Sequence, residues 1–501
     1  MATPYSQARR FGRLAVPVLT ASALALALAA CGGEAPSGTT AGTPAEKVTL
    51  SIALFGDFGF KPLYEEYKKT HPNVEVVERV TQFNDHHNNL VKRLATNAGA
   101  ADIEAVEVGY ISSFTAQADK FHDLKQYGLD KRQSDYLDWK WQQGLSKDGS
   151  KLLGLGTDVG GLAMCYRKDL FEKAGLPTDR EKVAELWPTW EQYIETGKKF
   201  AGSVKDAKFV DSPGEIFRAI VNQAPVGLYD AQDQIVVGTN PEVKKAWDLS
   251  NQLTQNDLTA KLAAFSPPWN TGFAKGSFAT IICPAWMTGY IQEQAKDATG
   301  KWDIAKVPGG SGNSGGSHLL LPKQGKHPKE AAELIDFLTS KDNQARVFKE
   351  EGTFPSIPAL YDDPSIQSFT KPFFGDAPIG KIYSDAARSL KPQHLGPKEG
   401  DVRVAIGDGP RPRRAGQADT RRGVGSGHLG RPEDQVAAGT AGRPPAPPYR
   451  MTPEDPAWPR SKPRRGAGTG GWSGTPSTSS CRPTPTSPPS SCCSAPSASS
   501  R

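Results

Sequence analysis

The side chains that most often carry catalysis or bind metals are present in this chain, but their spacing suits neither task. His86 and His87 are adjacent in the stretch NDHHNNL. Neighbouring residues on a helix point about 100° apart, so the two imidazoles do not converge on one ion. The sequence contains no H-E-x-x-H zinc motif and no phosphate-binding loop. Carboxylates are plentiful, so a glycosidase acid–base pair stays open as an alternative. We predict no catalytic residue, no metal and no cofactor.

Tryptophans offer a different chemistry, because a flat ring face can stack against an apolar face of a small molecule. Trp286 follows the strand-like run FATIICP, just past its carboxyl end, where a side chain can reach a cleft. Trp269 lies on a proline-braced loop directly before that run. The alternative for every tryptophan is packing in the core. We keep that interpretation for Trp247, on an amphipathic helix, and for Trp139 and Trp141, whose positions favour no other role.

The elements that must position such residues begin with an alternation of strands and helices. Three strand-like runs are each followed by a helical pattern, with strands at 48–54, 73–80 and 101–108 and helices at 60–72, 85–99 and 109–118. We expect Asn84 to cap the second helix and Gly99 to end it. This order predicts a parallel sheet with helices on both faces. Ligands of such sheets lie at the carboxyl ends of the strands, here the loops around Phe58, Asn84 and Tyr110.

The glycine-rich segment 154–161 separates two strand-like runs and predicts a crossover between two lobes. The first lobe is expected to begin with residues 48–153, and the second, mostly helical, to take residues 162–310. Residues 311–408 are expected to cross the hinge again and to contribute to both lobes. The predicted fold class is therefore α/β, with two lobes, a hinge and an interlobe cleft that can shut on a small solute.

Residues 1–30 combine a basic start with a short, alanine-rich apolar stretch and end directly before Cys31. This arrangement resembles the signal peptide of bacterial lipoproteins, in which the cysteine takes the lipid. An uncleaved anchor and an ordinary secretory signal are the alternatives. The Arg9-Arg10 pair leaves the export route open between general secretion and the twin-arginine pathway. Residues 31–47, rich in Gly, Ser, Thr and Pro, predict a flexible tether between a membrane and the folded body.

The formal net charge of +6 comes from the two ends of the chain. Residues 409–501 contribute +9 and residues 1–30 contribute +3, which leaves −6 for residues 31–408. A mildly acidic body has no need of a polyanionic partner. We therefore predict that the folded part binds no nucleic acid.

The composition changes abruptly after Asp408. Residues 409–501 contain thirteen Arg but one Lys, and no Phe, Ile or Asn. They are rich in Pro, Gly and Ser and lack strand or helix periodicity, which predicts a disordered tail. A wall-spanning or nucleic-acid-binding tail is one interpretation. We favour a frameshift, because DVRVAIGD at 401–408 resembles the start of a terminal helix that is interrupted.

Six stretches occur in the order found in the solute-binding proteins of carbohydrate ABC importers, which the chain resembles over residues 48–408. They are YEEYKKTHPNVEV, DIEAVEV, GTDVGGLAMCYRKDLFEKAGLP, TWEQYIETGKKF, FAKGSFATIICPAWMTGYI and GTFPSIPA. Within that family the chain is most similar to the lipoproteins for cellobiose and cello-oligosaccharides. The resemblance implies the two-lobed type II periplasmic-binding-protein fold, which closes on a sugar and delivers it to a permease.

The resemblance also implies a set of ligand contacts, because a sugar offers C–H faces to aromatic rings and hydroxyls to carboxylates, amides and backbone groups. It implies stacking by Trp286, although Cys-Pro-Ala-Trp stands here where the family has a Gly-Pro-Trp-like segment, so a one-residue displacement of the ring stays open. We expect Trp269 to be a second stacking ring. The other expected contacts are Phe58, Asn84, Asp85, Tyr110, Asp158, Gly316, Ser317, Phe354 and Asp376. A purely structural role is the alternative for each.

Cys165 and Cys283 are the only cysteines between Cys31 and the tail. Both lie in strand-like runs of the predicted second lobe, and secretion favours oxidation. If the two runs are neighbouring strands, as the resembled fold implies, a disulfide between them is possible. Two buried thiols are the alternative.

We therefore predict a monomeric, lipid-anchored receptor on the outer face of the cytoplasmic membrane, and not an enzyme. Its expected partners are an oligosaccharide, the permease subunits of an importer, and the membrane through its lipid. Cellobiose or cellotriose is the favoured ligand, ahead of xylobiose or another disaccharide. No ATP site is expected, because hydrolysis belongs to a separate subunit. The alternative of a different class is a secreted lipoprotein hydrolase.

Overall fold

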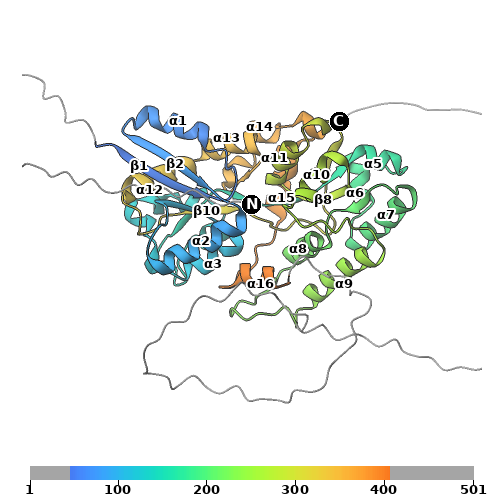
Figure 1. Ribbon diagram of the computed structural model, residues 1–501, viewed down its shortest axis with the longest axis horizontal. Helices are drawn as coiled ribbons and strands as arrows, with labels where there is room; N and C mark the ends of the chain where they lie inside the picture. Colours follow the sequence, from blue (N-terminus) through green and yellow to red (C-terminus); the bar gives the residue numbers. More distant parts are fainter. Residues whose placement is uncertain (1–45, 407–501) are drawn as a thin grey trace, which may run out of the picture. The chain divides into compact units, whose positions relative to one another are not determined.

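Two β-sheets with their helices organise residues 46–406, the part of the chain that the computed structural model describes (Figure 1). The predicted signal peptide, Cys31 and the predicted tail at 409–501 lie outside the described residues. Within 46–406, no helix is long and apolar enough to cross a membrane.

The first sheet has five strands in the order β2-β1-β3-β10-β4. Their bounds are β1 Val48–Leu54, β2 Val74–Val80, β3 Ile103–Glu107, β4 Gly154–Gly156 and β10 Ser317–Leu320. β1 pairs in parallel with β2 and with β3, as the strand–helix alternation predicts, whereas β10 runs antiparallel to β3 and β4. The central β3 is buried along almost its whole length, whereas in the edge strand β2 only Val74 is buried and the other residues are partly or fully exposed. We call this sheet and its helices the first lobe.

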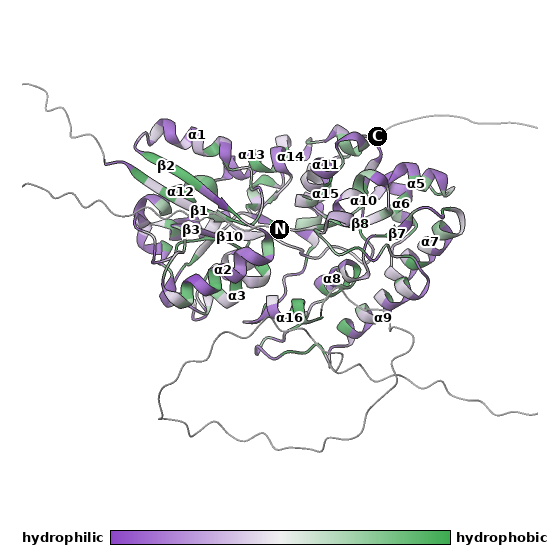
Figure 2. Ribbon diagram, in the orientation of Figure 1, coloured by the Kyte–Doolittle hydropathy of each residue, from purple (hydrophilic) through white to green (hydrophobic). Residues whose placement is uncertain are grey.

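Helices α1 Lys61–Thr70, α2 Phe83–Thr96 and α3 Val108–Thr115 follow β1, β2 and β3. Polar residues dominate the outer side of α1, and hydrophobic residues gather on the strands (Figure 2). The predicted boundaries of α2 were wrong at both ends. Gln82 is the N-cap and Asn84 lies inside the first turn, while Asn97, with φ 53°, ends the helix before Gly99. Asn tolerates this left-handed conformation, so no glycine is needed there.

The second sheet has four strands in the order β7-β8-β6-β9. Their bounds are β6 Leu162–Arg167, β7 Lys208–Val210, β8 Phe278–Pro284 and β9 Trp302–Ala305. β6 and β8 are antiparallel and buried along their whole length, because helices cover both faces of the sheet (Figure 1). These helices are α5 Lys168–Lys173, α6 Arg180–Glu185, α7 Trp190–Ser203, α8 Pro213–Gln223, α9 Pro241–Gln255, α10 Pro267–Lys275 and α11 Ala285–Gln294. We call this sheet and its helices the second lobe.

The chain passes from the first sheet to the second over residues 154–161, the range predicted as a hinge. The short strand β5 Asp158–Val159 lies within this crossing and pairs with β11 Phe354–Pro355. The chain returns through the glycine-rich loop 306–316 between β9 and β10. The two crossings touch, because Gly161 and Asn313 form an antiparallel bridge. The observed topology is that of the predicted two-lobed α/β fold.

The last part of the described chain packs against both lobes. Helix α12 Pro328–Leu338 contacts α1, whereas α15 Ile379–Ser389 contacts β6. The other elements of the described chain are α4 Asp138–Gln143, α13 Lys341–Glu351, α14 Pro364–Gln367, α16 Glu399–Ile406 and the 3-10 helices η1 Ala118–Lys120, η2 Leu124–Tyr127, η3 Leu129–Asp135, η4 Lys296–Ala298, η5 Pro358–Leu360 and η6 Pro372–Phe374.

Residues 391–406, which we call the C-terminal strap, contact both lobes. On the first-lobe side, the Ser112 hydroxyl of α3 donates to the carbonyl of Gly396 in the strap. On the other side, the Gln393 amide donates to the carbonyl of Val221 in the second lobe, at 2.7 Å. The strap ends in α16, which overlaps the stretch 401–408 that the sequence suggested as the start of a terminal helix.

The predicted disulfide is confirmed, since Cys165 and Cys283 are bonded with their Cα atoms 5.3 Å apart. Cys165 lies opposite Ile281 in the β6–β8 ladder, and Cys283 lies opposite Ala163, so the cysteines are diagonal neighbours. The bond lies in the centre of the second sheet, where both sulfurs are fully buried.

Replacing both cysteines by serine should lower the free energy of unfolding. The two cysteines are 118 residues apart, and a cross-link that closes a loop of about this length contributes about 4–5 kcal/mol in the chain-entropy account. Urea denaturation of the Cys165→Ser/Cys283→Ser variant, compared with the oxidised protein, measures the difference. A free-thiol count that does not change on reduction would show that the bond does not form.

Candidate functional site

Aromatic rings gather at the carboxyl ends of the first-lobe strands, where the sequence placed part of the site. Phe55 and Phe58 follow β1, and their ring centroids lie 5.1 Å apart. Phe83, at the start of α2, lies 5.3 Å from Phe55. Tyr110 of α3 stacks on His87 at 4.1 Å and 12°. Phe58 and Tyr110 are half-buried, so parts of their rings face outward from this cluster.

Asn84 and Asp85, two further predicted contacts, are exposed in the first turn of α2. Their polar groups are free to reach solvent or a ligand beside Phe83. The position of both residues at the end of β2 agrees with the expectation that loops after the strands line the site. Their contact with a ligand stays a prediction.

His86 and His87, which the sequence placed side by side on a helix, are both buried. The His86 ring donates to the carbonyl of Ala105 at 2.7 Å. His87 donates to the carbonyl of Phe83 at 2.8 Å and accepts the backbone N–H of Glu107 at 3.1 Å. Burial lowers the pKa of His86 to about 4 and that of His87 to about 3. Both imidazoles are therefore neutral at pH 7 and tie α2 to β3.

Trp286 is the predicted contact on the second-lobe side of the candidate site. It lies half-buried in the first turn of α11, and its indole N–H donates to the carbonyl of Ser314 in the returning crossing, at 3.0 Å. A Cβ on Gly315 would lie 2.8 Å from the indole nitrogen. The ring is thus held against the loop that joins the two lobes. The sequence predicted that this ring reaches a cleft, and its contact with a ligand stays a prediction.

Phe265 is a candidate that the sequence did not suggest. Its side chain is 48% exposed, and its backbone has φ 63°, which is rare for a bulky residue. The ring lies stacked with that of Trp286, at 6.3 Å and 21°. Because Phe265 lies in an irregular loop before α10, neither strand nor helix periodicity could identify it. The strained backbone holds an aromatic ring at the surface beside Trp286.

The prediction that Trp269 is a stacking ring does not fit its position. Trp269 is 1% exposed, and its indole N–H donates to the carboxylate of Asp211 at 2.7 Å inside the second lobe. Burial raises the pKa of Asp211 to about 7. Phe265 lies 5.2 Å from Trp269 and covers it. Trp269 therefore supports Phe265 from beneath, and it is Phe265 whose ring is exposed.

Phe354 also belongs to the core, in contrast to its predicted contact with a ligand. It is 1% exposed in β11 and packs against Phe348, Tyr361 and Tyr383. β11 pairs with β5 in the first crossing. The role of Phe354 is thus to anchor that crossing.

Asp376 lies away from the crossings, which corrects the prediction that it accepts ligand hydroxyls. Its turn is held by Arg180, which donates to the carbonyl of Gly375 at 3.2 Å and pairs with Asp303 of β9 at 3.0 Å. Asp303 lies opposite Tyr166, near the end of β6 that is far from the crossing. The site therefore does not include this turn.

Asp158, Gly316 and Ser317 are brought together where the crossings meet the first sheet. Asp158 is buried, and one of its carboxylate oxygens accepts the backbone N–H of Ser317 at 2.9 Å and the hydroxyl of Thr157 at 2.7 Å. Gly316 has φ 93°, and its carbonyl accepts the backbone N–H of Val108 at 2.9 Å. The three predicted residues thus lie together, but they are buried, with Asp158 and Ser317 only 6% and 5% exposed, and their contact with a ligand stays a prediction.

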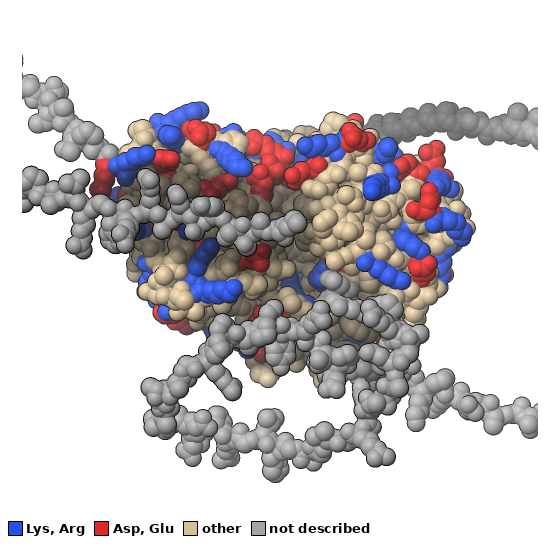
Figure 3. All heavy atoms as spheres, viewed as in Figure 1, with Lys and Arg blue, Asp and Glu red and all other residues tan. Residues whose placement is uncertain are grey.

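The end of α13 lies between the two aromatic groups. A Cβ on Gly59, in the loop of Phe58, would lie 2.6 Å from the Glu351 side chain. A Cβ on Gly289, in the helix of Trp286, would lie 2.1 Å from the Glu351 carbonyl. Acidic side chains gather on this face (Figure 3), and burial together with the nearby Asp57 raises the pKa of Glu351. Both lobes therefore contribute to one region around α13.

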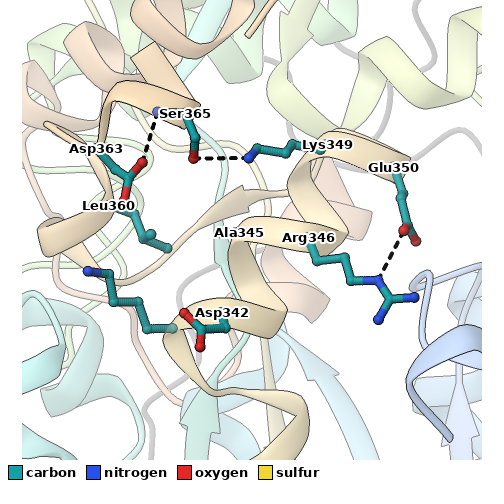
Figure 4. A pocket seen from close by; sticks show the side chains of 9 residues that line it. Asp342, Ala345, Arg346, Lys349, Glu350, Leu360, Asp363 and Ser365 are labelled. Carbon is teal, nitrogen blue, oxygen red and sulfur yellow. Dashed lines mark hydrogen bonds and ion pairs between the residues drawn. The ribbon is translucent and has the colours of Figure 1, made fainter. Parts of the chain in front are cut away.

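A shallow pocket on the outer face of α13 is a different feature (Figure 4). Its polar side chains bond to one another: Lys349 donates to the hydroxyl of Ser365 at 2.9 Å, and Arg346 pairs with Glu350 at 3.1 Å. Its lining includes no aromatic ring. A surface of this kind lacks the ring faces that Trp286 and Phe265 present.

The chain belongs to the family of bacterial extracellular solute-binding proteins, whose pattern matches residues 63–373. An arabinooligosaccharide-binding protein of Bacillus subtilis (strain 168) is 27% identical over 329 residues, which make up 63% of this chain and 73% of that protein. A protein of the same name from Halalkalibacterium halodurans is 24% identical over 323 residues, 60% of this chain and 69% of that protein.

Solved structures share the fold. An extracellular solute-binding protein of family 1 is 41% identical, with a TM-score of 0.63 over 72% of this chain and 92% of that one. The ABC transporter associated binding protein of B. animalis subsp. lactis Bl-04, in complex with beta-1,6-galactobiose, is 20% identical, with a TM-score of 0.65 over 72% and 91% of the two chains. The predicted fold class is confirmed, and so is the predicted class of solute-binding protein.

Protonation of the buried His87 should destabilise the protein in acid. Its folded pKa, about 3, lies below the ordinary value of 6.5. Its contribution to stability is therefore present above pH 6.5 and is lost as the pH falls toward 3, by at most about 1.4 kcal/mol per pH unit. Urea denaturation between pH 7 and pH 4 measures this loss.

A His87→Gln variant keeps an acceptor for the Glu107 N–H but cannot take up a proton. It should lose less stability than the wild type over the same pH range. Asn88→Gln, an exposed change on the same helix, is the matched control and should keep the wild-type dependence. An identical dependence in His87→Gln and the wild type would contradict the assignment.

Proposed function

We propose that this chain is the substrate-binding component of a carbohydrate ABC importer and binds an oligosaccharide between its two lobes. The observation that carries the proposal is the position of Trp286, a partly exposed indole fixed by Ser314 to the loop that joins the lobes. Phe265 extends the aromatic surface beside it. Pyranose rings present C–H faces that stack on such surfaces.

The lobes are proposed to close on the ligand by bending at residues 154–161 and 306–316. Few chain segments connect the sheets, which is the arrangement of hinged binding proteins. The second-lobe residue Asp233 pairs with Lys147 of the first lobe at 2.7 Å, and with His394 of the strap at 2.8 Å. These surface pairs are weak individually and can be broken when the lobes part.

Cellobiose or cellotriose is the ligand we propose first, on the sequence resemblance to the cello-oligosaccharide lipoproteins. Xylobiose or another disaccharide is the second choice. The relatives add further sugars to be tested, because two of them are named arabinooligosaccharide-binding proteins and a solved structure of the same fold holds beta-1,6-galactobiose. An oligosaccharide is common to all of these choices.

The setting that we propose is the outer face of the cytoplasmic membrane. Cys31 would carry a lipid, residues 31–47 would act as a leash, and the folded body would deliver its sugar to the permease subunits as a monomer. The basic, apolar order of residues 1–30 before Cys31 supports this proposal.

A carbohydrate hydrolase is the competing class. Gly312–Gly316 (GNSGG) has the G-x-S-x-G spacing of a nucleophile motif. However, this segment joins strands β9 and β10, whereas a nucleophile elbow joins a strand to a helix. The Ser314 carbonyl is occupied by Trp286. These features favour binding over hydrolysis.

A calorimetric screen of the full chain against gluco-, xylo-, arabino-, galacto- and manno-oligosaccharides tests the proposal. We expect binding of at least one disaccharide or trisaccharide, with a shift of tryptophan fluorescence and recovery of the sugar intact. Shortened products would support the hydrolase instead, and the absence of binding across the panel would refute the proposal.

Trp286→Leu should weaken the binding of that sugar by about twofold to tenfold, because an aromatic contact of this kind is worth about 0.5–1.5 kcal/mol beyond its area. Phe265→Leu should weaken binding to a smaller extent. Trp247→Leu is the matched control, since that tryptophan lies on α9 within the second lobe. Equal affinities for all three variants and the wild type would exclude this aromatic surface as the binding site.

A further inference from the structure

Lys140 is a lysine buried in the first lobe beside the proposed binding site. Its side chain is 1% exposed, although it lies on the short helix α4, between Trp139 and Trp141 in sequence. The aliphatic stem packs on Gly156, where a Cβ would lie 2.7 Å from Cε of the lysine. Burying a lysine this completely is costly unless its charge is compensated.

Charged and titratable groups from every neighbouring element face Lys140. Glu107 at the end of β3 and Asp158 of β5 attract its charge, and His318 of β10 is neutral because burial holds its pKa well below 6.5. Arg403 of α16 in turn faces Glu107. Arg403 also pairs with the buried Glu399 of α16 at 3.0 Å. The cluster therefore holds two cations and three carboxylates. Burial lowers the pKa of Lys140 to about 8, against the attraction of Asp158 and Glu107.

The ammonium of Lys140 differs from these neighbours in its contacts. Asp158 is engaged by Ser317 and Thr157, and Glu107 accepts the backbone N–H of Gly109. By contrast, no hydrogen bond or ion pair of residues 46–406 uses the Lys140 ammonium. A buried ammonium with three unused donors is unfavourable until acceptors reach it.

The ammonium also lies next to the loop that holds Trp286. A Cβ on Gly316 would lie 3.2 Å from the Lys140 nitrogen, and a Cβ on the preceding Gly315 would lie 2.8 Å from the Trp286 indole nitrogen. Consecutive Cα atoms are about 3.8 Å apart. A first-lobe donor and a second-lobe ring therefore contact neighbouring residues of one crossing.

We propose that Lys140 is a ligand-binding residue whose ammonium donates hydrogen bonds to hydroxyl and ring oxygens of an uncharged oligosaccharide. The inference rests on the proposed function, and it narrows the ligand class. The cluster already holds one carboxylate more than it has cations, so an acidic sugar would add a further unmatched buried charge. Neutral oxygens satisfy the ammonium without adding to that excess.

Calorimetry of the best-bound neutral sugar with Lys140→Met tests the inference. Methionine keeps much of the apolar stem and removes all three donors, so we expect the affinity at pH 7 to fall at least tenfold. Lys131→Met, which removes an exposed lysine from the nearby η3, is the matched control and should bind as the wild type does. Wild-type affinity in a Lys140→Met variant that circular dichroism shows to be folded would overturn the inference.

The wild type supplies a second measurement that needs no variant of Lys140. Its affinity should fall by up to tenfold per pH unit above about pH 8, because only the protonated lysine offers three donors. A flat profile from pH 7 to pH 10 would overturn the inference. A disaccharide that contains glucuronic acid should bind at least tenfold more weakly than its neutral counterpart, and equal or tighter binding would overturn the proposed ligand class. Failure of the proposed function is distinct, since the wild type would then bind no sugar of the panel.

Discussion

The arrangement of this protein depends on the close contact of two chain segments that cross between its lobes. A Cβ on Gly160 would lie 1.9 Å from the carbonyl oxygen of Ser314, so no other residue fits there without moving the backbone. The Ser314 N–H donates to the Gly160 carbonyl at 2.8 Å. This contact fixes the loop that Trp286 and Lys140 approach from different lobes. A change in the angle between the lobes would therefore move the two segments that form this contact.

Burial of polar groups beside this crossing ties the site to the rest of the fold. Asp158 holds the start of β10 through the Ser317 N–H. Glu107 lies near Arg403 of the C-terminal strap, and that strap also reaches the second lobe. In a low-dielectric environment such groups are stable only while their partners stay in place. The charges at the base of the site thus depend on elements from three distant parts of the sequence.

The aromatic surface shows how far prediction from sequence could reach. Trp286 was identifiable, because its place after a strand-like run is a local feature. Trp269 and Phe265 were not distinguishable by such a feature, and the structure buries the tryptophan while exposing the phenylalanine. Trp269 is held inside the lobe by Asp211, which accepts its indole N–H, and Phe265 is left at the surface. No spacing along the chain indicates that partner, 58 residues away.

The sequence by itself determined the elements whose signals are local: the alternation of the first three strands and helices, the glycine-rich crossing and the break in composition after Asp408. It also supplied the two cysteines, although their pairing needed the resemblance to a known fold. Only the tertiary structure decided which polar groups are buried. The burial of Lys140 is an example, because it depends on what β4, β10 and the crossing bring around α4, and those contacts join residues that are far apart in the chain.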